Sequence, residues 1–226
     1  MLEVEWNGRQ VALLDEKALY LVKERTLVIA DPHFGKAATF RQAGIGIPHG
    51  TTAADLERLD RALARTGAQR LVILGDFFHA AQGRSPKTLA TIGQWLQARR
   101  QLEVVLVRGN HDRHSGDPPA GWSIGCAMPP LVDGDWTYYH MPADANEGCV
   151  LAGHIHPAVR LHDPCGTYVR TPCFWFRERT VVLPAFGSFT GTYVVSPAME
   201  DRVFAVGPDA VVELNRKRRP AIRRRS

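Results

Sequence analysis

The sequence predicts an α/β fold in which two mixed β-sheets pack face to face between flanking helices, as a four-layer sandwich. Three features support this prediction: apolar runs that end in polar residues, amphipathic segments between those runs, and many short β-prone segments in the second half. The chain has 226 residues, of which 45% are hydrophobic and 23% are charged, so it can form a substantial core and is not broadly disordered.

The first half of the chain alternates apolar runs with amphipathic segments. The apolar runs, each of the kind that forms a strand buried on both faces, cover residues 27–30, 71–75 and 104–107. A Thr52-x-x-Asp55 pattern predicts a capped helix that runs to about Thr66, and a second helix is expected from Ser85, with Pro86 at its first position. This alternation predicts parallel strands with the helices outside.

The second half is richer in glycine and proline, and it predicts a second, more antiparallel sheet. Its β-prone runs cover residues 136–139, 150–152, 168–176, 180–183, 192–195, 203–206 and 211–214. Since no linker separates the two halves, we expect a single domain over residues 1–215. Residues 216–226 form a basic tail that we expect to be disordered.

The charge of the chain is concentrated in this tail. The tail holds seven basic side chains, and without them 21 basic residues stand against 23 acidic ones, a net charge of −2. Blocks of this kind either remain solvated or bind polyanions such as nucleic acid, and the tail alone favours neither reading.

Membrane and secreted classes are not indicated. The apolar runs are far shorter than the roughly 18 residues that span a bilayer, and the first residues lack the pattern of a signal peptide. Four cysteines without a C-x-x-C pair are too few for a disulfide framework, so we expect a reduced, cytoplasmic protein.

Five polar clusters follow predicted strands, where open α/β sheets bind ligands. They are Asp31-Pro32-His33, Gly75-Asp76, Gly109-Asn110-His111-Asp112, His140 and Gly153-His154-Ile155-His156. Carboxylate, amide and imidazole groups suit divalent metals, and the absence of thiolates argues against a zinc finger. Any one cluster is a weak signal, but the ordered set predicts a dinuclear metal centre.

The spacing within these clusters has a physical rationale. In an extended segment, Asp-x-His and His-x-His place alternate side chains on one side, so that two ligands can reach one metal. We expect Gly75, Gly109 and Gly153 to let the backbone turn or approach closely before each ligand.

The clusters together resemble the calcineurin-like metallophosphoesterases. The resemblance is closest to the DNA ligase-associated branch from bacterial repair clusters (the PdeM family), and it covers roughly residues 20–206. The motifs that carry the branch resemblance are residues 30–36 (ADPHFGK), 75–79 (GDFFH), 153–157 (GHIHP), 170–174 (RTPCF) and 183–191 (LPAFGSFTG).

The resemblance implies a ligand set and an acid. Asp31, His33 and His156 would hold one metal, and Asn110, His140 and His154 would hold the other. Asp76 would bridge the two, and His111 would give a proton to the leaving oxygen, with Asp112 orienting its imidazole. The family points to Mn²⁺ as the cofactor, although the ligand types also suit iron or zinc.

Basic groups beside the motifs are candidates for substrate binding. They are Lys36, Arg41, His79 and Arg113, each weighed against the simpler reading of a solvated surface charge. Phe174, Phe186 and Phe189 are read as packing residues rather than base-stacking platforms.

The functional expectation is a manganese-dependent phosphodiesterase that acts as a single-stranded DNA endonuclease in DNA repair. Family context implies a link to a DNA ligase, a helicase and an exonuclease. The alternative within the enzyme class is a phosphoesterase for a small nucleotide, a cyclic nucleotide or a lipid pyrophosphate. A non-catalytic scaffold is disfavoured because the whole ligand set and the acid histidine are present.

Overall fold

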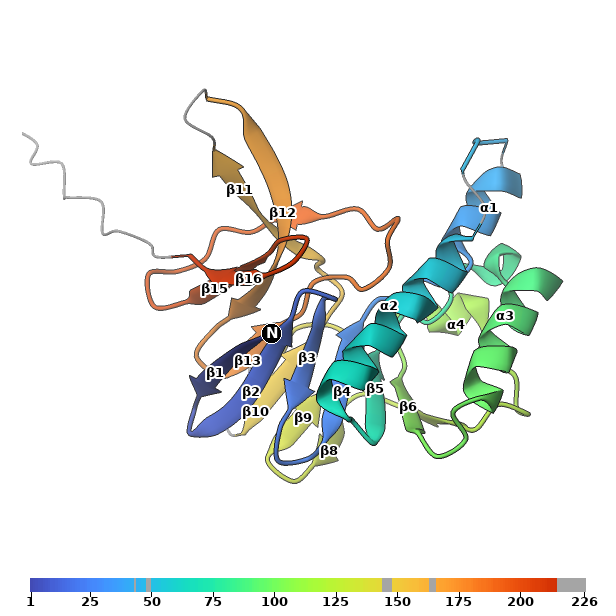
Figure 1. Cartoon of the computed structure of the whole chain (residues 1–226), viewed down its shortest axis with the longest axis horizontal. Coiled ribbons are helices and arrows are strands. Elements are labelled where there is room, and N and C mark those ends of the chain that lie inside the picture. Colours follow the sequence, from blue (N-terminus) through green and yellow to red (C-terminus); the bar gives the residue numbers. More distant parts are fainter. Residues whose placement is uncertain (43, 48–49, 144–147, 163–165, 215–226) are drawn as a thin grey trace, which may run out of the picture.

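A computed structural model describes the chain except for residues 43, 48–49, 144–147, 163–165 and 215–226. Its strands form a seven-stranded and a nine-stranded sheet, with the helices beside the first (Figure 1). This confirms the predicted fold class of two mixed sheets with flanking helices. The basic tail lies outside the described residues, so the expectation that it is disordered stays a prediction.

The seven-stranded sheet is built in chain order from an antiparallel and a parallel half. Its strands are β1 (Leu2–Trp6), β2 (Arg9–Leu14), β3 (Ala18–Leu21), β4 (Thr26–Ala30), β5 (Arg70–Leu74), β6 (Glu103–Val107) and β7 (Ile124–Ala127). The first four pair antiparallel, whereas β4 to β7 pair parallel, which confirms the expected parallel pairing of the three apolar runs.

The nine-stranded sheet comes from the second half of the chain. Its strands are β8 (Leu131–Asp133), β9 (Trp136–Tyr138), β10 (Cys149–Ala152), β11 (Pro157–His162), β12 (Tyr168–Phe176), β13 (Thr180–Val182), β14 (Tyr193–Val194), β15 (Arg202–Val206) and β16 (Val211–Glu213). Central β10 runs parallel to β9 and β13, and most other pairs are antiparallel, as the sequence predicts.

The helices that the structure describes all come from the first half of the chain. They are α1 (Lys36–Gln42), α2 (Thr51–Thr66), the 3₁₀ helix η1 (Ala81–Gly83), α3 (Pro86–Gln97) and α4 (Asp112–Ser115). Apolar side chains of α2 and α3 pack on the first sheet, whereas the described helices leave the far face of the second sheet uncovered. The expected fourth, helical layer is therefore not present among the described residues.

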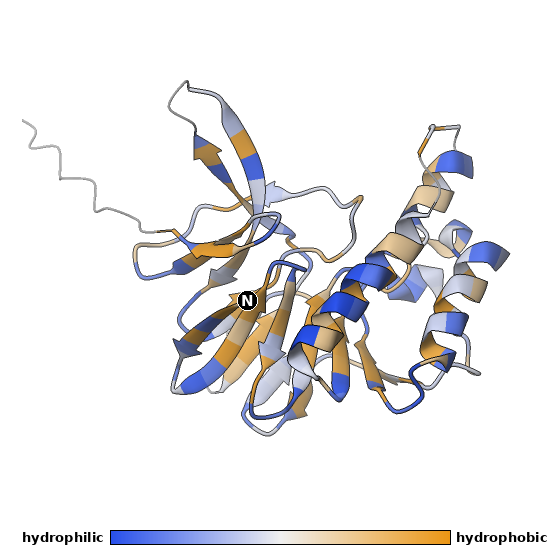
Figure 2. Ribbon diagram, viewed as in Figure 1, coloured by the Kyte–Doolittle hydropathy of each residue, from blue (hydrophilic) through white to orange (hydrophobic). Residues whose placement is uncertain are grey.

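Two apolar layers hold the sandwich together. One lies between the sheets and includes Trp6, Trp136, Phe174 and Phe176, while the other lies between the first sheet and its helices. In Figure 2 the strands are mainly orange, and blue residues gather on α2 and α3. Burial on both sides of the first sheet explains why its parallel strands are continuously apolar.

The two predicted helices begin differently. Ser85 caps α3 as expected, because its hydroxyl accepts a hydrogen bond from the Thr88 amide at 3.2 Å. The predicted side-chain cap of α2 is wrong: its N-cap is Gly50 in the left-handed conformation, with no side-chain bond. None of the helices that the structure describes is long and apolar enough to cross a membrane.

Candidate metal centre

The first sheet supplies one half of the candidate site from the carboxyl ends of its parallel strands. Asp31 directly follows β4, Asp76 comes two residues after β5, and Asn110 comes three residues after β6. Since β4, β5 and β6 are neighbours, their ends bring these three side chains to one edge of the sheet.

The second sheet supplies the other half. His140 comes two residues after β9, and His154 and His156 follow β10 within four residues. The His154 amide donates to Asp31 Oδ2 at 2.8 Å, which ties this loop to the end of β4. The candidate centre thus depends on the packing of one sheet against the other.

The backbone that presents the ligands is left-handed rather than extended. Asp31, His33, Asp76, His154 and His156 have φ values of 51°, 44°, 53°, 69° and 53°. The expectation that each X-x-X motif is an extended segment is therefore wrong. Positive φ is uncommon for residues other than glycine, and such strain clusters at functional sites.

Three glycines let these segments approach one another closely, as expected. A Cβ at Gly75 would lie 2.2 Å from His140 Nδ1, one at Gly109 2.3 Å from Asp76 Oδ1, and one at Gly153 2.5 Å from Asp31 Oδ2. Each distance is far below a normal contact, so any larger residue would displace a candidate ligand.

One candidate ligand group consists of Asp31, His33 and His156. Their ligand atoms lie within 4.8 Å of one another. The His156 imidazole is oriented by the carbonyl of Gly191, 3.0 Å from Nδ1, and its Nε2 lies 3.6 Å from Asp31 Oδ1. Asp31 Oδ1, His33 Nδ1 and His156 Nε2 are buried without hydrogen-bond partners among the described residues.

The second candidate group consists of Asp76, His140 and His154, again with ligand atoms within 4.8 Å. His140 Nδ1 donates to the Leu74 carbonyl at 3.0 Å, so Nε2 is the unprotonated nitrogen whose lone pair can bind a metal. That Nε2 lies 2.8 Å from Asn110 Oδ1 and 3.1 Å from His154 Nδ1.

Asp76 lies between the two groups. Its Oδ1 is 3.5 Å from His140 Nε2, and its Oδ2 is 3.8 Å from His33 Nε2. A carboxylate in this place can reach a cation in either group, which is the position that the bridging role requires.

The chemistry of the set fits cations. Asp31 and Asp76 are 0% and 2% exposed, and each has a carboxylate oxygen within 3.6 Å of a His140 nitrogen. Two buried carboxylates around one imidazole need compensating positive charge. Burial, followed by the nearby His156, lowers the pKa of His33 to about 2, so that its imidazole is held in the neutral form that binds metals. Orphaned acceptors, paired carboxylates and neutral imidazoles together form a donor set suited to two divalent ions.

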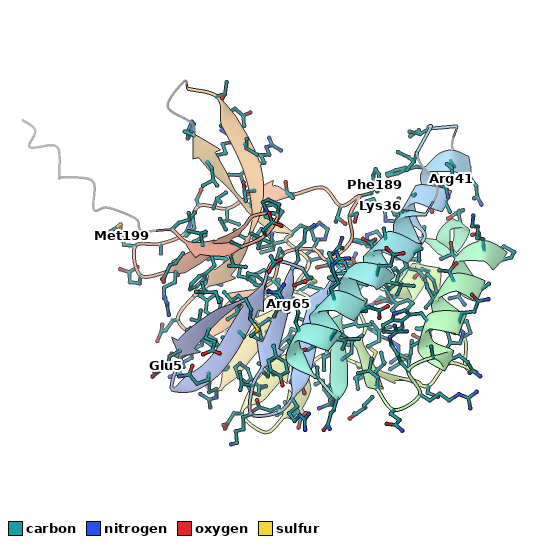
Figure 3. The ribbon with its side chains drawn as sticks, in the orientation of Figure 1. Glu5, Lys36, Arg41, Arg65, Phe189 and Met199 are labelled. Atoms are coloured by element: carbon teal, nitrogen blue, oxygen red, sulfur yellow. The ribbon has the colours of Figure 1, made fainter. Side chains whose placement is uncertain are left out.

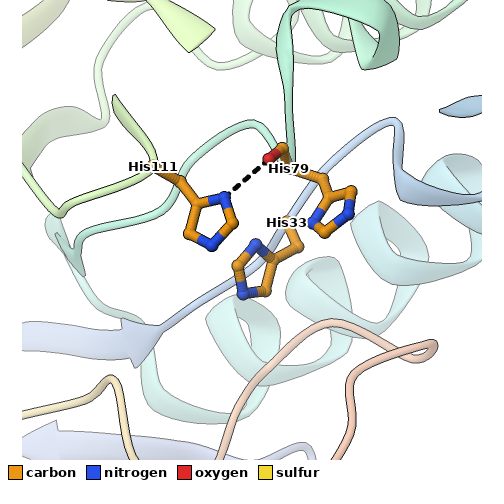
Figure 4. A group of neighbouring side chains, drawn as sticks. All are labelled: His33, His79 and His111. Carbon is orange, nitrogen blue, oxygen red and sulfur yellow. Dashed lines mark hydrogen bonds between the residues drawn. The ribbon is translucent and has the colours of Figure 1, made fainter. Parts of the chain in front are cut away.

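His111 stands beside these groups with two other histidines. Figure 4 shows His33, His79 and His111 facing one another, with His111 Nδ1 2.8 Å from the His79 carbonyl. His111 Nε2 lies 3.9 Å from Asp76 Oδ2, and 39% of its side chain is exposed. The ring is therefore fixed at one nitrogen and reachable at the other.

Asp112 does not orient His111, and that expectation is wrong. Its carboxylate accepts hydrogen bonds from the main-chain amides of Asp76, Phe77 and Gly109, at 2.8, 3.0 and 2.8 Å. It therefore joins the turn after β5 to the turn after β6 and fixes the main chain that carries Asp76. The His79 carbonyl takes the place that was expected for Asp112.

Three of the candidate substrate-binding residues, Lys36, Arg41 and His79, lie on or beside α1. Lys36 begins α1, with Nζ 5.8 Å from the Phe40 ring, and it lines a small pocket with His33 and Phe189. Figure 3 shows Lys36, Arg41 and Phe189 at the end of the molecule where α1 lies. Arg41 donates to the Ile47 carbonyl at 3.3 Å.

His79 lies beside α1, with its ring centroid 6.0 Å from that of Phe40. The His79 ring stacks on His111 with centroids 5.4 Å apart, so it faces the same space as the candidate acid. Burial, followed by Lys36, lowers the pKa of His79 to about 4. Arg113 is exposed on α4.

Sequence reasoning missed a support beneath the first ligand group. Asp55 of α2 accepts hydrogen bonds from the Ser188 hydroxyl and from Arg58, and Arg58 donates to the Phe186 carbonyl. These contacts hold the segment that leads to Gly191, whose carbonyl orients His156. The sequence signal for this support is the 183–191 motif, which contains Phe186, Ser188 and Gly191.

Comparisons with known proteins indicate a family for this chain. The calcineurin-like phosphoesterase family matches residues 24–163. The solved nuclease MPE of Pseudomonas putida is 41% identical, with a TM-score of 0.83 over 94% of this chain and 99% of that one. The Yfce phosphoesterase of E. coli is 17% identical, with a TM-score of 0.40 over 82% of this chain and 90% of that one. No curated protein matches this chain.

Calcineurin-like phosphoesterases use a dinuclear divalent metal site, and this chain has two neighbouring groups of possible ligands. The Pseudomonas putida match is consistent with the expected ligase-associated branch. The family match spans more than half of the chain. The chain therefore belongs to the calcineurin-like phosphoesterase family.

Proposed function

We propose that the protein is a phosphodiesterase that cleaves single-stranded DNA internally. The observation that carries the reaction type is the pair of ligand groups joined by Asp76, with His111 beside them. Support for the substrate comes from the 41% identical Pseudomonas putida protein, which is named a nuclease and has nearly the same length.

In this proposal the chain holds two divalent ions, which are Mn²⁺. Asp31, His33 and His156 hold one, Asn110, His140 and His154 hold the other, and Asp76 bridges them. When bound, such ions activate water and neutralise charge on a phosphodiester. The ligand types, all oxygen or imidazole nitrogen, are compatible with manganese.

The remaining residues bind substrate and move a proton. His111, fixed by the His79 carbonyl, donates the proton from Nε2 to the leaving oxygen. Asp112 acts indirectly, because it positions the main chain of Asp76. Lys36, Arg41, His79 and Arg113 contact the DNA beside the cleaved bond.

The cellular role follows from the same family context. We place the activity in the cytoplasm, in DNA repair, alongside a DNA ligase, a helicase and an exonuclease. The few cysteines and the described helices, none of which could span a membrane, are compatible with this setting.

The test is an assay of the purified full-length chain with Mn²⁺ on three substrates: circular single-stranded DNA, duplex DNA and a phosphomonoester. Cleavage of the circle, which has no ends, is expected and identifies an endonuclease. Hydrolysis of a chromogenic diester without cleavage of the circle would overturn the DNA substrate in favour of a small phosphodiester. Loss of the activity with EDTA is expected, and its persistence would contradict the metal assignment.

A further inference from the structure

The hairpin of β11 and β12 stands out from the body of the molecule (Figure 1). Strand β11 begins at Pro157, directly after the ligand His156. The outer described residues of both strands, 160–162 and 168–170, are all exposed. A two-stranded hairpin that does not bury its outer part gains little stability from it, so its surface chemistry needs another explanation.

The two faces of this hairpin differ in character. Arg160 pairs with Arg170, and His162 pairs with Tyr168, so these four side chains share one face. We call them the basic face. The opposite face carries Leu161 and Val169, which are likewise paired.

The basic face combines cations with an aromatic ring. The Arg160 guanidinium lies 5.0 Å from the centre of the Tyr168 ring, and the His162 ring lies 6.0 Å from it. No carboxylate of a described residue pairs with Arg160 or Arg170. Two like charges placed directly opposite destabilise a hairpin, which suggests that an anionic ligand compensates them.

The basic face lies on the same side of the second sheet as the side chains that pack against the first sheet. Directly opposite and alternate residues share a face, so Arg170 is on the same side of β12 as Phe174 and Phe176. Those two phenylalanines lie in the layer between the sheets. The two candidate ligand groups lie at the end of this same layer, and their residues come from both sheets.

The separation between Arg160 and the candidate metal centre corresponds to a few nucleotides of a single strand. Arg160 comes four residues after His156, or about 13 Å at about 3.3 Å per residue. At about 3.4 Å per nucleotide of a helical strand, this is about four nucleotides. Alternating arginine and aromatic side chains are the usual means of gripping phosphates and stacking bases of single strands.

We propose that the basic face binds single-stranded nucleic acid about four nucleotides from the cleaved bond. The arginines contact phosphates, and Tyr168 stacks on a base. This deepens the proposed function and rests on it for the cleavage, but the binding can be measured separately.

The test compares two double variants that remove the same charge. Arg160→Ala/Arg170→Ala alters the basic face, whereas Lys23→Ala/Arg100→Ala alters exposed residues beside the amino ends of β4 and β6, at the opposite edge of the sheet. Affinity for a labelled single strand of about 20 nucleotides is measured by anisotropy in EDTA, at several salt concentrations.

We expect the basic-face variant to bind about tenfold more weakly, with a salt slope reduced by about 1.4, or about 0.7 for each phosphate contact. The control variant should retain the affinity and slope of the unmodified chain. In Mn²⁺, the KM for the long strand should rise by about the same factor, and the factor should shrink for an oligonucleotide of about two nucleotides, which cannot reach the hairpin.

Tyr168→Ala provides an independent arm, because it changes stacking without changing charge. It should weaken binding while leaving the salt slope unchanged, whereas Tyr168→Phe should restore the affinity. Equal weakening by the two double variants, or no weakening by the first, would overturn the inference. If the unmodified chain binds the strand through the basic face but does not cleave it, the proposed function fails and this inference stands.

Discussion

At the scale of single residues, the hydrogen bond to the His79 carbonyl decides what His111 can do. A carbonyl oxygen only accepts, so His111 Nδ1, at 2.8 Å from it, carries the proton. The other nitrogen, Nε2, points toward Asp76 and is the atom that can exchange a proton with a bound substrate. This geometry supports the proposed acid without requiring a carboxylate partner.

Replacement of His111 should separate proton donation from metal binding. We expect His111→Ala to keep both metals and to slow cleavage of diesters with poor leaving groups by about 10²–10⁴, and those with good leaving groups much less. Rates on a series of aryl phosphodiesters, with metal content measured in parallel, check this. His114→Ala, an exposed neighbour, is the control. Equal losses along the series would contradict the acid role.

The residue types of the site could be predicted, but their backbone and partners could not. The histidines and aspartates after strands were visible because ligand chemistry restricts the residue types. The left-handed φ of Asp31 or His154 was not, because it depends on contacts such as the one between Asp31 Oδ2 and the His154 amide, across 123 residues. The partners of Asp112 are likewise set by distant turns, as far as 36 residues away.

At the scale of elements, helix α2 supports the candidate metal centre through residues 186–191, which its first turns contact. Asp55 is buried, and its contacts with Arg58 and Ser188 fix the segment that presents the Gly191 carbonyl to His156. Because Asp55 makes these tertiary contacts, the Thr52-x-x-Asp55 pattern does not cap α2.

Weakening this support should lower metal affinity without unfolding the chain. We expect Asp55→Asn to reduce Mn²⁺ affinity by about 10–100-fold, because groups that orient a ligand contribute by this amount. Calorimetric titration checks this, together with the melting temperature. Asp60→Asn, on the same helix and paired with Arg99, is the matched control. Equal Mn²⁺ affinity in the two variants would refute the positioning role.

Among the first three strands, the local sequence pattern predicts β1 but not β3. Strand β1 alternates Leu2, Val4 and Trp6 toward the core with exposed glutamates between them, a period of two that predicts a half-buried strand. Strand β3 has no such signal, because all of its four residues are buried. Its pairing between β2 and β4 follows from the sheet as a whole and not from local pattern.

The turn between β2 and β3 carries a lysine with an altered titration. Burial, followed by the nearby Arg58, lowers the pKa of Lys17 to about 8. An unfolded lysine titrates near 10.4, so between these values the unfolded chain binds more protons and stability rises with pH.

Removing this amine should flatten that rise. We expect the free energy of unfolding of Lys17→Met, measured with urea at about pH 7.5 and about pH 9.5, to change less between the two pH values than that of the unmodified chain. It should also be the more stable protein at the lower pH, where the buried charge is costly. Lys23→Met, at an exposed position, should behave as the unmodified chain. Identical pH dependence in all three would contradict the assignment.

At the scale of the whole molecule, the candidate metal centre depends on the apolar core between the two sheets. The first sheet contributes Asp31 and Asp76, and the second contributes His140 and His154, so the ligands meet only when the layer between the sheets is packed. The order of apolar runs was sufficient to predict the two sheets. The closeness of the ligands was not predictable in detail, since it depends on how large side chains such as Trp136 and Phe174 fill that layer.

Metal binding should therefore stabilise the whole fold. A ligand that binds the folded state at about 100 times its Kd adds about 2.7 kcal/mol, which for a chain of this size raises Tm by about 5–11 °C. We expect this rise when Mn²⁺ is added to EDTA-treated protein in a thermal melt. Asp76→Ala should abolish the rise together with the activity, because one carboxylate adjoins both ligand groups. An equal rise in the variant, or full activity with two metals bound, would show that Asp76 does not bridge them.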